Sequence, residues 1–143
     1  FWNGHGGPGG WAWVLDDFMG GCGATNLFVD LPGNPLRLGA KAPVVFAASC
    51  LTGNYEAEPG RSGARAFLRN RAAVYIGATE VSPTGNNAEM SAAFFRDYWS
   101  STAASVGEAF TRFKCDKVCT GDEYWRFVCY EYNIYGDPKF GRR

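Results

Sequence analysis

Two side chains in this 143-residue sequence could carry out nucleophilic chemistry together, the imidazole of His5 and the thiol of Cys50. His5 is the only histidine, and the glycine on either side of it lets the backbone turn sharply and leaves the ring uncrowded. Cys50 comes at the end of an apolar run. A cysteine becomes a nucleophile where a neighbouring base or positive charge favours its thiolate. The chemistry therefore depends on whether the fold brings these two side chains together.

The elements that precede the two residues favour such an arrangement. Residues 43–48 form a short apolar run whose length and β-branched content predict a buried strand that leads to Cys50. Phe1 and Trp2 are typical of the last residues of another strand, whose earlier part we expect to precede this sequence. Two parallel strands joined by a crossover would place His5 and Cys50, 45 positions apart (50 − 5), at one edge of a sheet. The alternative interpretations are a surface loop histidine and a buried structural thiol.

The rest of the chain alternates expected strands with expected helices. A second buried strand is predicted over 72–78, and Ser62 can cap a helix that covers 63–70. Ser105 and Glu108 fit a capping box that opens another helix. The remaining expectations are loops at 3–10 and 20–39, an edge strand at 26–30, a short helix or turn at 11–18, a turn at 83–87, a helix at 88–100, a polar stretch at 114–124, a strand at 125–134 and a turn at 136–138. This alternation predicts an α/β fold with a mainly parallel sheet flanked by helices.

Composition and charge exclude several classes of protein. Hydrophobic residues make up 46% of the chain and charged residues only 20%, so the chain can bury a core and is not intrinsically disordered. The 14 Lys and Arg residues balance the 14 Asp and Glu residues, and no basic surplus favours binding to nucleic acid. No apolar run reaches the roughly 18 residues that a membrane helix needs, so we expect no membrane span.

The other four cysteines suggest a structural role. Cys115, Cys119 and Cys129 lie near one another in the sequence, and Cys22 stands apart. A zinc site is disfavoured because the spacing lacks a paired Cys-x-x-Cys set and no histidine lies nearby. We expect instead a disulfide bond from Cys129 to Cys115 or Cys119. Such a bond favours an exported protein, either secreted or at the cell surface.

Five short motifs follow one another along the chain in a fixed order. They are Gly4-His5-Gly6 followed by Trp11, the strand 44–48 with Ser49-Cys50-Leu51-Thr52-Gly53 after it, the strand 73–78, the segment Val106-Gly107-Glu108-Ala109-Phe110, and Tyr135-Gly136-Asp137-Pro138. Together they resemble the gingipain family of caspase-like cysteine peptidases, and the similarity covers nearly all of the sequence. The resemblance implies a caspase-like fold of which residues 1–143 form the C-terminal part. The N-terminal segment of that fold would then be a partner, either covalently linked or a separate chain.

The resemblance also implies a mechanism and a class of substrate. Cys50 would attack the scissile carbonyl of a protein or peptide, and His5 would act as the general acid and base. The backbone N–H of Gly6, with that of Cys50, would face the developing oxyanion. Glu80 lies where the family has a wall of its specificity pocket, and it could select Arg or Lys at the cleaved bond by ion pairing. The alternative for Glu80 is a solvated loop carboxylate or a helix cap.

The sequence departs from the family pattern in two places. A long segment rich in glycine and proline lies between Met19 and Gly39, and no acidic residue precedes His5 to orient it. The resemblance requires no cofactor, although gingipains hold calcium; Asp116, Asp122 and Glu123 form an acidic loop here, with no ligand assigned. The competing hypotheses are a catalytically silent caspase-like scaffold or binding module, and a structural piece of a larger secreted assembly.

Overall fold

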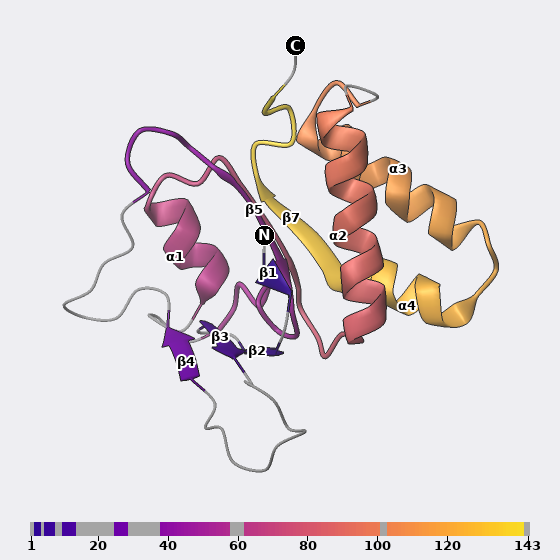
Figure 1. The fold of residues 1–143 in the computed structure, drawn as a ribbon, viewed down its shortest axis with the longest axis horizontal. Coiled ribbons are helices and arrows are strands. Elements are labelled where there is room, and N and C mark those ends of the chain that lie inside the picture. The colour runs from indigo at the N-terminus through magenta and orange to yellow at the C-terminus, as the bar shows by residue number, and fades with distance from the viewer. Residues whose placement is uncertain are drawn as a thin grey trace.

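The strands of the chain form two sheets, seen in a computed structural model that describes residues 2–3, 5–7, 10–13, 25–28, 38–57, 62–100 and 103–141 (Figure 1). The larger sheet has the strand order β1 (Trp2–Asn3), β5 (Val44–Ala48), β6 (Val74–Ala78) and β7 (Tyr132–Gly136). The smaller sheet consists of β2 (His5–Gly7), β3 (Gly10–Trp13) and β4 (Thr25–Phe28). The N-terminal segment therefore passes from the larger sheet at β1 directly into the smaller sheet at β2.

The larger sheet is mixed, and the strand pairings of the two sheets together are mainly antiparallel, which corrects the expectation of a mainly parallel sheet. Its pairings β1–β5 and β5–β6 are parallel, whereas β7 runs antiparallel to β6. Both pairings of the smaller sheet are antiparallel, so the described strands make three antiparallel pairings and two parallel ones. β7 is antiparallel because the preceding helix α4 (Glu123–Glu131) ends where β6 ends, with Tyr132 paired to Ala78. The α/β class is confirmed.

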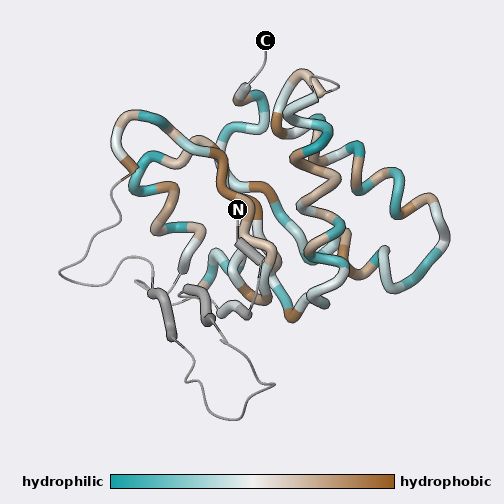
Figure 2. The backbone as a smooth tube through the Cα atoms, in the orientation of Figure 1, coloured by the Kyte–Doolittle hydropathy of each residue, from teal (hydrophilic) through white to brown (hydrophobic). Residues whose placement is uncertain are grey.

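Helices cover both faces of the larger sheet (Figure 1). Because side chains alternate along a strand, each strand supplies residues to two separate cores. One core contains Phe46, Val74 and Ile76, which pack with α2 (Thr84–Trp99), α3 (Val106–Val118) and α4. The other contains Ala47 and Tyr75, which pack with α1 (Gly63–Arg69). Figure 2 shows the resulting concentration of hydrophobic residues along the central strands.

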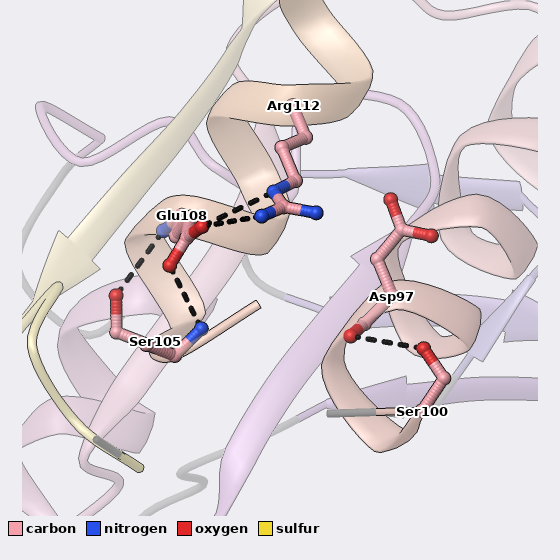
Figure 3. A network of polar contacts seen from close by, with 6 residues as sticks. Asp97, Ser100, Ser105, Glu108 and Arg112 are labelled. Atoms are coloured by element: carbon pink, nitrogen blue, oxygen red, sulfur yellow. Dashed lines mark hydrogen bonds and ion pairs between the residues drawn. The ribbon is translucent and has the colours of Figure 1, made fainter. Parts of the chain in front are cut away.

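Local sequence signals fix the starts of two helices as expected. The Ser62 hydroxyl caps α1 by accepting from the Arg65 N–H. The Ser105 hydroxyl accepts from the Glu108 N–H at 3.2 Å, which confirms the capping box (Figure 3). The Glu108 carboxylate in turn accepts a hydrogen bond from the Ala104 N–H at 2.8 Å, and it also forms an ion pair with Arg112. No helix in the described part of the chain is both long enough and apolar enough to cross a membrane.

Between residues 83 and 134 the predictions for 83–87 and 125–134 are wrong. Residues 83–87, predicted as a turn, form the start of α2, since Pro83 has a φ of −73° and precedes the first helical residue. Residues 125–134, predicted as a strand, are mostly α4, which begins after the Asp122 cap and buries Val128 and Cys129. The polar stretch at 114–124 is mostly the end of α3 and the start of α4.

The N-terminal third is more strand-rich than its glycines suggest. Strands β1 and β2 lie in the expected loop at 3–10 and its approach. Of the helix or turn expected at 11–18, residues 11–13 belong to strand β3, and residues 14–18 lie outside the described residues. The expected edge strand at 26–30 is found as β4, at the edge of the smaller sheet. Cys22 and most of the segment between Met19 and Gly39 lie outside the described residues.

Candidate active site

The register of the larger sheet brings the backbones of His5 and Cys50 to the same edge. Asn3, the last residue of β1, pairs with Ala48, the last residue of β5, and these two strands are parallel neighbours. His5 and Cys50 each follow two residues later in the chain. Adjacent strands lie about 4.8 Å apart. The two candidate residues therefore leave the sheet side by side at its carboxyl edge.

Gly6 lies close against the segment that carries Cys50. A Cβ atom added to Gly6 would lie 2.6 Å from Ser49 Cβ, 2.7 Å from the Cys50 carbonyl oxygen and 2.8 Å from Thr52 Cγ2. Those distances are too short for any side chain. Glycine at this position therefore allows the backbone of the His5 segment to lie directly against the backbone of Cys50.

The loop that carries Cys50 is held at several points. The Leu51 N–H donates to the Glu80 carbonyl at 2.9 Å, and the Gly53 N–H donates to the Ala78 carbonyl at 2.7 Å. The Thr52 hydroxyl donates to the carbonyl oxygens of Ser49 and Ala47 within its own loop. These bonds join the loop to the carboxyl end of β6 and leave Cys50 little freedom.

Two tyrosines extend from the sheet to the same loop. The Tyr75 hydroxyl of β6 donates to the Thr52 carbonyl at 3.0 Å, and the Tyr135 hydroxyl of β7 donates to the Gly53 carbonyl at 2.6 Å. Burial raises the pKa of both phenols above the ordinary value, so both hydroxyls stay protonated donors. The tyrosines therefore hold the Cys50 loop from β6 and from β7.

The sulfur of Cys50 lies in a half-buried polar environment. It accepts from the Ser82 N–H at 3.3 Å, and as a thiol it can donate to the Ser82 carbonyl at 3.3 Å. The Ser82 hydroxyl lies 4.0 Å from the same sulfur and is bonded in turn to Asn87. Sequence reasoning missed both residues, because Ser82 follows Cys50 by 32 positions and no motif links them.

Two carboxylates lie near the carboxyl end of β6. Glu80 is exposed, in the loop whose backbone is bonded to Leu51. Glu131 is only 3% exposed, and neither of its carboxyl oxygens has a hydrogen-bond partner among the described residues. Burial, with a smaller contribution from the charge of Glu80, raises the pKa of Glu131 from 4.5 to about 7. The sequence reasoning found Glu80 and missed Glu131, which lies in the segment predicted to be a strand.

The model of peptidase family C25 matches residues 1–141 of the chain. The chain belongs to peptidase family C25. This confirms the resemblance to gingipains, and it makes the protein a member of a cysteine peptidase family, with peptides as the implied substrate. Comparison with curated proteins and with solved structures gave no match.

The remaining cysteines of this C25 chain do not form the expected disulfide bond. Cys115, Cys119 and Cys129 are all free, and the Cys129 thiol is buried with its sulfur 3.9 Å from the Lys114 carbonyl. Cys115 and Cys119 are exposed, because their side of α3 faces away from the core. The expectation of a secreted or cell-surface protein was based on this disulfide bond, so the free thiols leave it without that support.

The acidic loop of the C25 chain serves to cap a helix. The Asp122 carboxylate accepts from the N–H groups of Tyr124 and Trp125 at the start of α4. No group of three His, Cys, Asp or Glu side chains among the described residues is placed to hold a metal ion. No ligand for the expected calcium ion can therefore be named among the described residues.

Proposed function

We propose that this C25 chain supplies the catalytic dyad of a cysteine endopeptidase, with Cys50 as the nucleophile and His5 as the general acid and base. The observation that carries the proposal is the pairing of Asn3 with Ala48, together with the close approach of Gly6 to Cys50. Both support a site in which the imidazole and the thiol leave one sheet edge from adjacent parallel strands. The half-buried position of Cys50 also favours a thiol that a substrate can reach.

The proposed reaction has two stages. The Cys50 thiolate attacks the carbonyl carbon of the scissile bond, and the electron pair of the C=O bond moves to oxygen. Collapse of this intermediate breaks the C–N bond, and the His5 imidazolium gives its proton to the leaving amine. A water molecule, deprotonated by His5, then attacks the thioester. The acid product leaves and Cys50 is regenerated.

The oxyanion would be bound by backbone N–H groups. We assign this role to the N–H of Gly6 and that of Cys50, which belong to the two segments in contact. A preorganised donor of this kind is worth roughly 3 kcal/mol to the transition state. The missing side chain at Gly6 keeps these two backbones close enough to share one oxygen atom.

We also propose that Glu80 selects a basic residue at the cleaved bond. Its carboxylate is exposed, and its own carbonyl is bonded to Leu51, the residue next to the nucleophile. A substrate Arg or Lys could therefore reach this carboxylate while its carbonyl lies at Cys50. In a Glu80→Gln variant we expect the preference for Arg and Lys over Leu to fall at least tenfold in kcat/KM. The matched control is Glu123→Gln, an exposed carboxylate on α4, which should leave the preference unchanged.

The dyad is tested by labelling and by turnover in the intact protein. A peptidyl acyloxymethyl ketone should label Cys50 ahead of the exposed Cys115 and Cys119. Substitutions Cys50→Ala and His5→Ala should each abolish cleavage of a fluorogenic peptide library while the folded structure persists by circular dichroism. The control Cys115→Ala should remain active. Equal labelling of the exposed cysteines, or turnover in the Cys50→Ala variant, would show that the dyad is wrong. A folded protein without turnover would favour the catalytically silent module.

A further inference from the structure

A chain of buried polar side chains runs through the interior and ends at the sulfur of Cys50. The Tyr132 hydroxyl contacts Asn87 Oδ1 at 2.7 Å, and Asn87 Nδ2 contacts the Ser82 hydroxyl at 2.8 Å. The Ser82 hydroxyl in turn lies 4.0 Å from Cys50 Sγ. These residues come from β7, α2 and the loop after β6. Three separate elements therefore converge on the nucleophile.

The burial of this chain indicates that its bonds matter. Tyr132 is fully buried, Asn87 is 1% exposed and Ser82 is 5% exposed. Burying an amide or a hydroxyl is costly unless it is hydrogen-bonded, and here each group uses another member of the chain as its partner. Asn87 lies on the core-facing side of α2, where an apolar residue would have filled the same space without any polar partner.

The direction of the hydrogen bonds follows from Asn87. Its Nδ2 atom also lies 3.5 Å from the Ser82 carbonyl oxygen, which can only accept. The amide nitrogen must therefore face Ser82, and the amide oxygen must face Tyr132. Tyr132 then donates to Asn87, and Asn87 donates to the Ser82 oxygen. The Ser82 hydroxyl also interacts with the Tyr132 hydroxyl, so its proton can point at the Tyr132 oxygen or at Cys50 Sγ. Of these two acceptors a charged thiolate is the stronger.

We propose that Ser82 is a catalytic residue that stabilises the Cys50 thiolate by donating hydrogen bonds from its N–H and its hydroxyl, and that Asn87 and Tyr132 are positioning residues that aim this hydroxyl. The proposal rests on the function proposed above for Cys50. The 4.0 Å separation belongs to the resting thiol, and such contacts shorten when the acceptor becomes charged. The Ser82 N–H, already at 3.3 Å, supplies the second donor.

The chemistry of Tyr132 fits its place at the start of this chain. Burial raises the pKa of its phenol above the ordinary value, so the hydroxyl stays protonated and keeps donating to Asn87. Its backbone is held as well, because Lys114 Nζ donates to the Tyr132 carbonyl at 2.9 Å. The titratable residues on the elements around Cys50 are His5, Tyr75, Glu80, Glu131, Tyr132 and Tyr135, and the test below changes only Tyr132 among them.

The test is the pH profile of Cys50 alkylation, which reports the thiolate whether or not the protein turns over a peptide. Iodoacetamide modification of the Cys50 peptide is followed by mass spectrometry between pH 5 and 10 in the folded, intact protein. In Ser82→Ala we expect the midpoint of the profile to rise by about one pH unit, so that the rate below the midpoint falls about tenfold. Tyr132→Phe, which removes only a hydroxyl, should raise the midpoint by a smaller amount.

A control variant and a double variant distinguish the positioning of the Ser82 hydroxyl by Tyr132 from a general structural role. Ser91→Ala removes another buried hydroxyl of α2 that is bonded to Ala88 instead, and its profile should match the wild type. Because Tyr132 acts through Ser82, the double variant Ser82→Ala with Tyr132→Phe should match Ser82→Ala alone. Additive shifts would overturn the positioning role, and an unchanged midpoint in Ser82→Ala would overturn the proposal. If the midpoint shifts but the protein does not cleave peptides, the role of Ser82 stands and the proposed peptidase activity is wrong. If the protein cleaves peptides and the midpoint does not shift, the activity stands and the role of Ser82 is wrong.

Discussion

The buried carboxyl of Glu131 predicts that this protein loses stability as the pH rises through neutrality. The folded state raises the pKa of Glu131 to about 7, against 4.5 for the free group, because the carboxyl is desolvated and lies near Glu80. Between these two values the folded protein holds a proton that the unfolded chain has released. Stability therefore falls as the pH rises whenever the folded state binds more protons. As far as Glu131 is concerned, the folded state has its full stability below pH 4.5, where this carboxyl is protonated in both states. Part of that stability is lost as the pH rises from 4.5 through about 7.

The size of the effect follows from the shift. A difference of 7 − 4.5 units, at about 1.4 kcal/mol per unit, costs the folded state about 3 kcal/mol once both states are ionised. Solvent screens this carboxyl little, since Glu131 is only 3% exposed. A loss of this size is a large part of the stability of an ordinary domain. Substituting Glu131→Gln removes the ionisation and keeps the shape of the side chain.

Urea unfolding between pH 4.5 and 8.5, under reducing conditions, measures this difference. We expect Glu131→Gln to gain stability relative to the wild type by up to about 3 kcal/mol as the pH rises from 4.5 to 8.5. The other titrating groups are common to both proteins and cancel. Glu80→Gln should move the fall in wild-type stability to lower pH, by a smaller amount because its charge is the lesser cause. A difference between wild type and Glu131→Gln that is flat across this range would refute the reasoning.

Two further predictions concern the backbone around the nucleophile. Gly6→Ala should destabilise the fold by about 1–3 kcal/mol and abolish alkylation selectivity at Cys50, because a Cβ has no room there. The control is Gly7→Ala, where an added Cβ would meet no atom within 4 Å; this variant should behave like the wild type in urea unfolding. Tyr135→Phe should cost about 1 kcal/mol by removing the hydrogen bond to Gly53, while the exposed Tyr130→Phe should cost nothing measurable; equal unfolding midpoints for the two variants would contradict this account of the loop.

The central strands were predictable from sequence because their signal is local. The runs at 43–48 and 72–78 are apolar, short and rich in β-branched or aromatic residues, and both are found as β5 and β6 within two residues of the predicted bounds. The Ser62 and Ser105 caps are local as well, since the donor and the acceptor lie three residues apart. The shared edge of His5 and Cys50 followed from the strand at 43–48 together with the strand end expected at Phe1 and Trp2, which lies beside it as β1.

The segment at 125–134 was misassigned although a helical signal is present. Its aromatic and β-branched residues favour a strand by propensity. Yet the apolar side chains that are buried or half-buried between 125 and 132 are Trp125, Val128, Cys129 and Tyr132, which follow the helical spacing of three and four, while Phe127 and Tyr130 are exposed. The helical spacing of the buried apolar residues outweighs the strand propensity of the segment, which forms a helix. A strand prediction for this segment does not place Glu131 at the end of a helix.

The Ser82, Asn87 and Tyr132 chain had no local signal at all. Asn87 lies within Thr-Gly-Asn-Asn, a composition typical of turns, and its side chain is explained only by a tyrosine 45 positions away. A polar residue on the buried side of a helix is costly until its partner is known. Such contacts are set by the packing of three elements, and no spacing rule within one element reports them.

Different groups position Cys50 and are proposed to select the substrate. The bond between Leu51 and Glu80 joins backbone atoms, so the side chain at position 80 can change without moving the loop of the nucleophile. The side-chain hydroxyl of Ser82, two residues later, lies 4.0 Å from the sulfur, so its replacement by alanine removes a group beside the thiol. Variants at Glu80 should therefore alter which peptide is cleaved at constant Cys50 alkylation, and variants at Ser82 should alter alkylation at constant peptide preference. A variant at either position that changed both properties together would mean that the loop moves as one unit and that the backbone bond does not isolate the two functions.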